Sequence, residues 1–114
     1  MKLDNVSKSF AGRRVLNNLT YEFGKGITAI TGPSGVGKST LTGIMAGLIK
    51  PDAGYVLRGE GKMSIVFQED RLLPHRSAVD NVRFVCGAGE AEILSHLEQV
   101  GLGDKLKNKP NQLS

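Results

Sequence analysis

The chain has 114 residues, a length that suits one domain and not two. Its 39% hydrophobic and 23% charged residues, without low-complexity tracts, are typical of a soluble globular protein. The formal charge of +4 is modest and no aromatic residues interleave with the basic clusters, so we expect solvated surface and no nucleic-acid partner. A single cysteine excludes an internal disulfide, and no apolar run reaches the roughly 18 residues of a membrane span. We therefore expect a cytosolic protein, held at a membrane only through a partner.

The first part of the chain is expected to form β-structure over residues 2–7 and 13–23. In the second of these runs, apolar residues alternate with polar ones and give one apolar face. Ala11-Gly12 supplies the turn between the two runs. The next apolar run, Ile27–Thr31, is short and rich in β-branched residues, which predicts a buried strand.

The segment after that strand is a phosphate-binding motif. Gly32-Pro33-Ser34-Gly35-Val36-Gly37-Lys38-Ser39, followed by Thr40, matches G-x-x-x-x-G-K-[ST], the Walker A loop or P-loop. Glycine is needed where φ is positive or where a side chain would block the approach of a polyanion. Lys38 is expected to reach the β- and γ-phosphates, and the Ser39 hydroxyl is expected to ligate Mg²⁺. The alternative is a glycine-rich turn that binds nothing.

The flanking elements favour the phosphate-binding interpretation. Apolar residues at helical spacing predict an amphipathic helix over roughly 38–48, which Lys50-Pro51 ends. Its positive dipole end would face a bound anion. Pro51–Gly54 is expected to be a turn, and two strands, Tyr55–Leu57 and Met63–Phe67, are expected to follow as a hairpin.

The last third of the chain changes from β- to α-structure. Ser77 and Asp80 form a capping-box pattern at the start of one helix, which Gly87-Ala88-Gly89 ends. Residues 90–100 have the apolar spacing of a second helix, with Gly101 as its stop signal.

Three features outside the P-loop resemble the ATP-binding cassette (ABC) ATPases. Phe10 precedes the P-loop, Gln68 ends the run Ser64–Gln68, and Arg71-Leu72-Leu73-Pro74 leads into Ala78–Val82. The last segment is most similar to the ATPase subunits of bacterial nitrate, sulfonate and taurine importers. The resemblance implies an α/β P-loop NTPase fold, an ABC-type nucleotide-binding domain that is truncated. It would contain an antiparallel β subdomain and the start of the helical subdomain.

The resemblance also implies a domain plan and a set of site residues. Residues 1–68 would form the β and P-loop core, and 69–114 the Q-loop with part of the helical subdomain. Phe10 would stack on adenine, and Gln68 would ligate Mg²⁺ together with Ser39. The alternatives are a core phenylalanine and a surface glutamine. The implied nucleotide-binding residues are Phe10, Gly32, Pro33, Ser34, Gly35, Val36, Gly37, Lys38, Ser39, Thr40 and Gln68.

The function implied by the resemblance is ATP binding, with Mg²⁺, by a subunit that drives import. In the family, hydrolysis takes place in a dimer, and a membrane permease would dock near residues 69–82 and hold the subunit at the inner face of the membrane. Lys38 and Gln68 would contribute to catalysis, but we expect no complete catalytic set in this chain, because no apolar strand ending in Asp-Glu follows the P-loop. Leu113-Ser114 resembles the first two residues of the signature motif. We therefore expect the chain alone to bind ATP without hydrolysing it. A non-transport ABC ATPase in DNA repair or translation, and a P-loop nucleotide or small-molecule kinase, are the alternatives.

Overall fold

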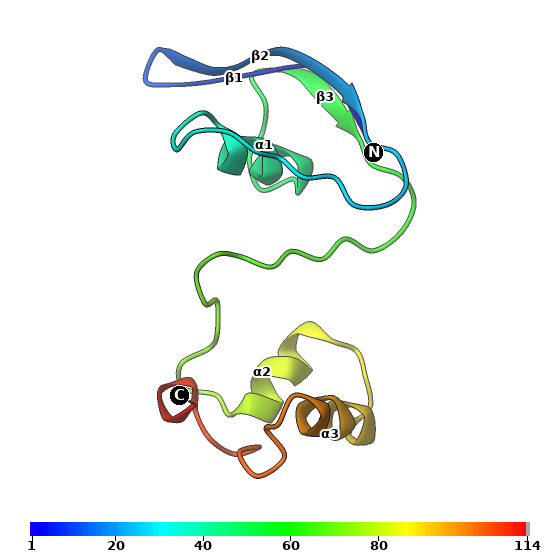
Figure 1. Cartoon of the computed structure of the whole chain (residues 1–114), viewed down its shortest axis with the longest axis vertical. Coiled ribbons are helices and arrows are strands. Elements are labelled where there is room, and N and C mark those ends of the chain that lie inside the picture. The colour runs from blue at the N-terminus through cyan, green and yellow to red at the C-terminus, as the bar shows by residue number, and fades with distance from the viewer. Residues whose placement is uncertain (114) are drawn as a thin grey trace. The chain divides into compact units, whose positions relative to one another are not determined.

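The structure, a computed structural model, describes residues 1–113. The chain forms two compact units, which divide between Ile65 and Val66. The first unit contains three strands and one helix, which are β1 (Lys2–Phe10), β2 (Arg13–Glu22), α1 (Lys38–Met45) and β3 (Ala53–Leu57). The second contains two helices and a 3₁₀ turn, which are α2 (Ala78–Val85), α3 (Glu90–Gln99) and η1 (Pro110–Gln112). Figure 1 labels the helices α1 to α3 and the strands.

The sheet of the first unit has the order β2-β1-β3, and both of its strand pairs are antiparallel. The hairpin between β1 and β2 turns through Ala11 and Gly12, whose φ angles are +47° and +78°. Two successive positive φ angles match the right-handed twist of the flanking strands. The predicted antiparallel β-structure is confirmed, and β1 extends to Phe10, beyond the predicted end at residue 7.

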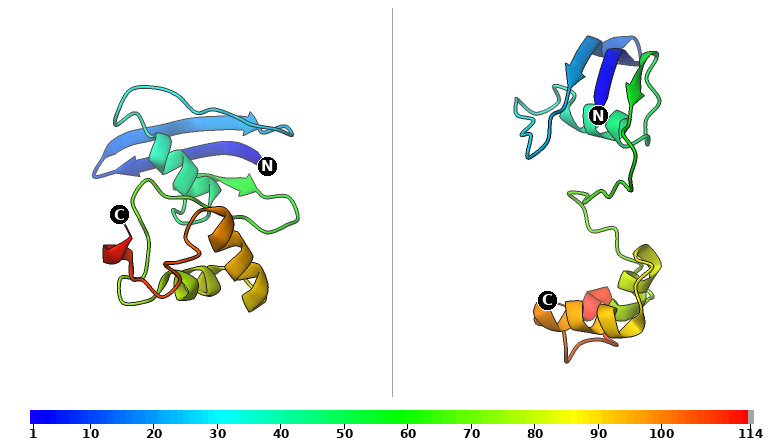
Figure 2. Two further views of the ribbon diagram at one scale, coloured as in Figure 1. Left: turned by 60° about the horizontal axis from the view of Figure 1, so that its bottom comes forward. Right: turned by 90° about the vertical axis from the view of Figure 1, so that its right-hand side faces the viewer.

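Helix α1 packs against one face of this sheet (Figures 1 and 2). Leu3 and Val6 of β1 and Ile44 of α1 are fully buried and form the centre of the core. Partly buried apolar residues surround them, namely Leu16, Leu19, Phe23, Leu41, Met45, Ile49 and Val56. The amphipathic pattern predicted for α1 thus positions the helix on the sheet.

Two predicted strands do not form. Residues 27–31 and 63–67 have no regular structure, and Ile27 is fully exposed. Strand β3 pairs with β1 instead of forming a hairpin with residues 63–67. The predictions were wrong because an apolar, β-branched segment becomes a strand only where a neighbouring strand offers it hydrogen bonds. The described sheet offers these two segments none.

Helix α1 ends at Met45, three residues before the predicted end. Gly47, with φ of +78°, donates its N–H to the carbonyl of Ile44, and Leu48 donates to the carbonyl of Gly43. These two bonds form a Schellman motif, which ends the helix before Lys50-Pro51 does. The predicted turn at 51–54 is also shorter, because β3 begins at Ala53.

The second unit follows the predicted capping signals closely. The Ser77 Oγ accepts a hydrogen bond from the backbone N–H of Asp80 at the start of α2. Helix α3 ends in another Schellman motif, in which Gly101 has a φ of +76° and Leu102 donates to the carbonyl of Leu97. The buried apolar residues of the second unit are Ala78, Ile93 and Leu97. No helix within residues 1–113 has the length and hydropathy needed to cross a lipid bilayer.

Candidate nucleotide-binding site

The P-loop leads directly into α1, as the Walker A motif predicts. Gly32, Gly35 and Gly37 all have positive φ, at +145°, +76° and +113°. Gly37 is also closely approached by β2, since a Cβ on it would lie 2.7 Å from the Val15 Cγ1 atom. Conformation and space thus both require glycine at residue 37. Neither requirement depends on a bound ligand, so the loop is shaped by the fold itself.

Lys38, the first residue of α1, folds back across this loop. Its Nζ donates to the carbonyl oxygen of Gly32 at 2.8 Å and to that of Pro33 at 2.7 Å. The ammonium group is therefore held over the loop, where a phosphate oxygen could replace a carbonyl as its acceptor. This geometry suits a polyanion bound within the loop.

The first turn of α1 carries backbone donors and the Ser39 hydroxyl. Gly37 is the N-cap and supplies no side-chain acceptor to the first N–H groups of the helix. Ser39 is exposed and Thr40 is partly exposed, while Pro33, Ser34 and Val36 form the exposed rim of the loop. Free N–H groups at a helix N-terminus favour phosphate, and an exposed hydroxyl is a ligand that Mg²⁺ accepts. These residues fit a nucleoside triphosphate with its magnesium ion.

Phe10 lies at the end of β1, where it pairs with Arg13 across the hairpin. Its side chain is 47% exposed and is not part of the core around Leu3, Val6 and Ile44. A core phenylalanine would be buried. The exposure agrees with a stacking surface, and the role of this ring in binding adenine stays a prediction.

Gln68 is exposed and lies in a segment without regular structure, in the second unit. Lys38 and Ser39 belong to the first unit. A shared magnesium site of Ser39 and Gln68 therefore stays a prediction. Within residues 1–113, no group of three or more His, Cys, Asp or Glu side chains could hold a metal ion.

Hydrogen bonds of Asn81 connect the segment after Gln68 to α2, and the sequence analysis gave this residue no role. Its Oδ1 accepts from the N–H of Leu73 at 2.7 Å, and its Nδ2 donates to the carbonyl oxygens of Leu73, Arg76 and Ser77 at 3.0–3.3 Å. One amide thus shapes the whole turn before α2. Asparagine is suited to this because it offers both donors and an acceptor.

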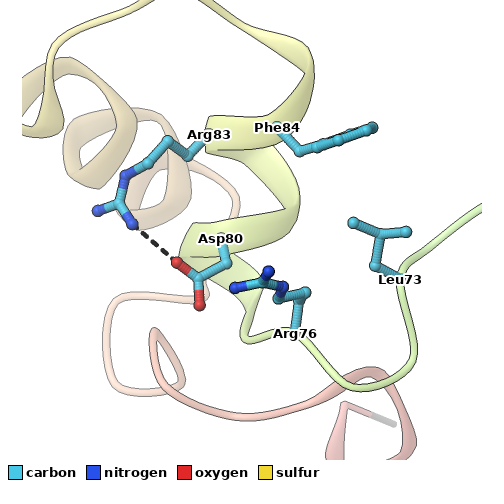
Figure 3. Close-up of a pocket in the computed structure, with 5 residues that line it drawn as sticks. All are labelled: Leu73, Arg76, Asp80, Arg83 and Phe84. Carbon is cyan, nitrogen blue, oxygen red and sulfur yellow. Dashed lines mark hydrogen bonds and ion pairs between the residues drawn. The ribbon is translucent and has the colours of Figure 1, made fainter.

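This turn and α2 line an open pocket of about 330 Å³ (Figure 3). Its lining residues are Leu73, Arg76, Asp80, Arg83 and Phe84. Arg83 binds Asp80 at 2.7 Å, and the Phe84 ring is 74% exposed. Hydrogen bonding from Ser77, together with the nearby charge of Arg83, lowers the pKa of Asp80, which keeps this carboxylate ionised. The pocket is therefore lined by both apolar and charged side chains.

The sequence of the chain was compared with models of known protein families. The model of the ABC transporter family matches residues 16–114. The chain belongs to the ABC transporter family. The resemblance found in the sequence and the α/β P-loop fold class are thereby confirmed, and the kinase alternative is set aside.

The names of two similar proteins are consistent with this family assignment. It is 39% identical to the aliphatic sulfonates import ATP-binding protein SsuB 3 of Pseudomonas savastanoi pv. phaseolicola, over 96% of this chain and 44% of the relative. It is 37% identical to the lipoprotein-releasing system ATP-binding protein LolD of Bacteroides thetaiotaomicron, over 100% of this chain and 63% of the relative. The chain thus spans less than two thirds of the length of these curated relatives.

A solved structure shares the fold. It is the dimeric, post-hydrolysis state of the ATP-binding cassette MJ0796 bound to ADP and Pi, with a TM-score of 0.77 and 30% sequence identity. The likeness covers 99% of this chain and 62% of that one. The sequence analysis interpreted Leu113-Ser114 as the start of the signature motif. Ser114 lies outside the residues that the present structure describes, so this interpretation stays a prediction.

Proposed function

We propose that this chain is the ATP-binding part of an ABC importer subunit, which binds ATP with Mg²⁺ and, in the whole protein, hydrolyses it as a dimer to drive transport. The observation that carries the proposal is the P-loop geometry, with Lys38 folded over the positive-φ glycines. The dimeric cassette with ADP and Pi and the import protein of Pseudomonas savastanoi support it by similarity. A non-transport ABC ATPase is the alternative, and no feature of residues 1–113 favours it.

In this proposal each site residue has a role in binding. Backbone N–H groups of Gly32–Thr40 and the Lys38 ammonium would hold the phosphates, and Phe10 would stack on the base. Ser39, together with Gln68, would bind Mg²⁺. Phosphoryl transfer depends mainly on positioning and charge stabilisation, and Lys38 would supply part of the charge.

Substitution of Lys38 tests the binding site directly. In the whole protein, Lys38→Ala should abolish binding of ATP with Mg²⁺, because the phosphates lose the cation of the loop. Lys50→Ala makes the same chemical change at an exposed residue beyond α1 and serves as the control. Equilibrium titration with ATP measures both variants. Unchanged affinity in Lys38→Ala would refute the proposed site.

The partner of the second unit would be a helix of the membrane permease, seated on residues 69–82 and the pocket beside them. Leu73 and Phe84 offer apolar surface, and Arg76 forms no ion pair within the described residues, so an acidic and apolar helix would fit. This arrangement would hold the subunit at the cytoplasmic face of the membrane.

Two adjacent exposed residues of α2 test this docking surface. Phe84 lines the pocket, whereas Val85 is 80% exposed and is not among the lining residues. Phe84→Ser should prevent co-purification of the whole protein with its permease, and Val85→Ser should not. ATP binding by the isolated subunit should be the same in both variants. Equal retention of the permease by both variants would rule out the pocket as the docking surface.

A further inference from the structure

Lys8 and Asp52 form a contact between two segments that are far apart in the sequence. The Lys8 Nζ lies 2.7 Å from the Asp52 Oδ1, and the Asp52 Oδ2 accepts from the N–H of Ser9 at 2.7 Å. The backbone N–H of Asp52 donates to the carbonyl of Ser7 at 2.9 Å. Asp52 is therefore fixed to three consecutive residues of β1. The hydrogen bonds from Lys8 and then Ser9 lower the pKa of its carboxyl group, so Asp52 is anionic at neutral pH.

The same lysine lies over the ring of Phe10. Its Nζ is 5.3 Å from the ring centroid, which is within the range of a cation–π interaction. Residues two apart in a strand lie on the same face, so β1 itself brings Lys8 beside Phe10. The Lys8 side chain is 16% exposed and that of Phe10 is 47% exposed. The ammonium thus contacts the ring, which still keeps a large open surface.

Within residues 1–113 the Phe10 ring belongs to neither the core cluster nor the one aromatic pair, which joins Tyr21 and Phe23. It also lies at the tip of a hairpin, beside a two-residue turn. Lys8, itself held by Asp52, is the charged neighbour that contacts this ring.

We propose that Lys8, fixed by Asp52, is a positioning residue for the nucleobase: it holds the Phe10 ring so that the open face receives adenine. The inference rests on the proposed role of Phe10. The ammonium attracts the electrons of the ring from one side, which favours stacking of the electron-rich base on the other. Lys8 itself touches neither the base nor the phosphates.

A purely structural contact between β1 and the turn before β3 would predict a different outcome. Loss of such a contact would loosen the first unit and weaken every ligand of the P-loop alike. A positioning role concerns only ligands that carry a base. ATP and inorganic triphosphate therefore distinguish the two explanations, because triphosphate has no adenine to stack.

The experiment measures the binding of both ligands to the whole protein by equilibrium titration. Phe10→Ala should weaken ATP by roughly 5- to 150-fold, as is usual for the loss of an aromatic stacking partner. Lys8→Met should weaken ATP by about 2- to 5-fold and leave triphosphate unchanged, and Lys8→Arg should restore the affinity for ATP. Lys2→Met is the matched control, because Lys2 lies in the same strand and pairs with Asp4 at 3.6 Å.

A double variant connects the two residues. In the Phe10→Ala background, Lys8→Met should cause no further loss of ATP affinity, because there is no ring left to position. An equal loss for ATP and triphosphate, or a loss that persists in the Phe10→Ala background, would overturn the positioning role of Lys8. Unchanged ATP affinity in Phe10→Ala alone would instead refute the proposed function of Phe10, and the inference with it.

Discussion

Arg58 binds the C-terminal end of α1. Its Nε donates to the carbonyl of Met45 at 2.8 Å, and its Nη2 donates to the carbonyl of Ile44 at 2.9 Å. The last carbonyls of a helix have no partners within it and carry the negative end of its dipole. Because Arg58 directly follows β3, this contact joins the sheet to the helix whose other end carries Lys38.

Arg58→Ala should therefore lower the free energy of unfolding of the whole protein by about 1–2 kcal/mol, since two hydrogen bonds from a charged but largely exposed donor are lost. Arg58→Lys keeps the charge but not the planar pair of donors, so it should restore only part of the lost free energy of unfolding. Urea denaturation measures the loss. Arg13→Ala is the control, because Arg13 makes no side-chain hydrogen bond or ion pair within residues 1–113. Equal midpoints for the two alanine variants would contradict the prediction.

Gly54 is a second position that the fold restricts. Its φ is +76°, and a Cβ there would overlap the backbone of Asp4 and Asn5 in the neighbouring strand β1. Gly54→Ala should cost roughly 2 kcal/mol or more, because backbone strain and a main-chain overlap add. Gly59→Ala is the control, since a Cβ at Gly59 meets no atom within 4 Å and its φ is not positive. A chemical denaturation curve of each variant measures the difference, and a Gly54→Ala variant as stable as Gly59→Ala would refute the pairing of β3 with β1.

The Asp80 carboxylate should make stability depend on acid pH. Its pKa is lowered in the folded protein by the Ser77 hydrogen bond and by Arg83, so its stabilising effect is complete above the pKa of the unfolded state, about 4. The effect is lost as the pH falls through the lower folded pKa. The urea midpoint of the wild type should therefore approach that of Asp80→Asn below about pH 4.

The matched control for this titration is Asp104→Asn, because the Asp104 side chain forms no ion pair or hydrogen bond in the described part of the chain. Its midpoint should follow that of the wild type in parallel at every pH. A constant difference between the wild type and Asp80→Asn from pH 6 to pH 3 would show that the ionisation of Asp80 has no effect on stability.

Local signals in the sequence predicted the elements that depend on local chemistry. Ser77 begins α2 and Gly101 ends α3 as expected, because a cap or a positive φ is a property of a few neighbouring residues. The P-loop glycines are predictable for the same reason, since a positive φ at Gly35 or Gly37 follows from the motif.

Contacts between distant residues were not predictable. Nothing in the sequence pairs Lys8 with Asp52, which lie 44 residues apart, or Arg58 with the end of α1. The early end of α1 at Met45, just before Gly47, was not predicted because the apolar spacing continues to Leu48, yet Leu48 is 61% exposed. Helix periodicity indicates a face, whereas a glycine with positive φ decides where the helix stops.

The exposed apolar segments lead to a prediction about the chain on its own. Ile27 and Val66 are almost completely exposed, and Met63, Ile65 and Phe67 are more than 40% exposed. Both segments were predicted as strands, and in the described structure they have no strand partners. Unpaired apolar segments of high β-propensity are sites of aggregation.

A polypeptide limited to residues 1–114 should therefore be poorly soluble or molten, and it should show no measurable ATP turnover. Within residues 1–113 the buried apolar residues are only Leu3, Val6, Ile44, Ala78, Ile93 and Leu97, which is a small core for two compact units. Net stability is normally only about 5–15 kcal/mol, so cores this small leave little of it. Size-exclusion chromatography, binding of a hydrophobic dye, a thermal melt and phosphate release test the expectation together. A monomer with one sharp, reversible thermal transition would show that the two small cores suffice and that residues 27–31 and 63–67 need no strand partners.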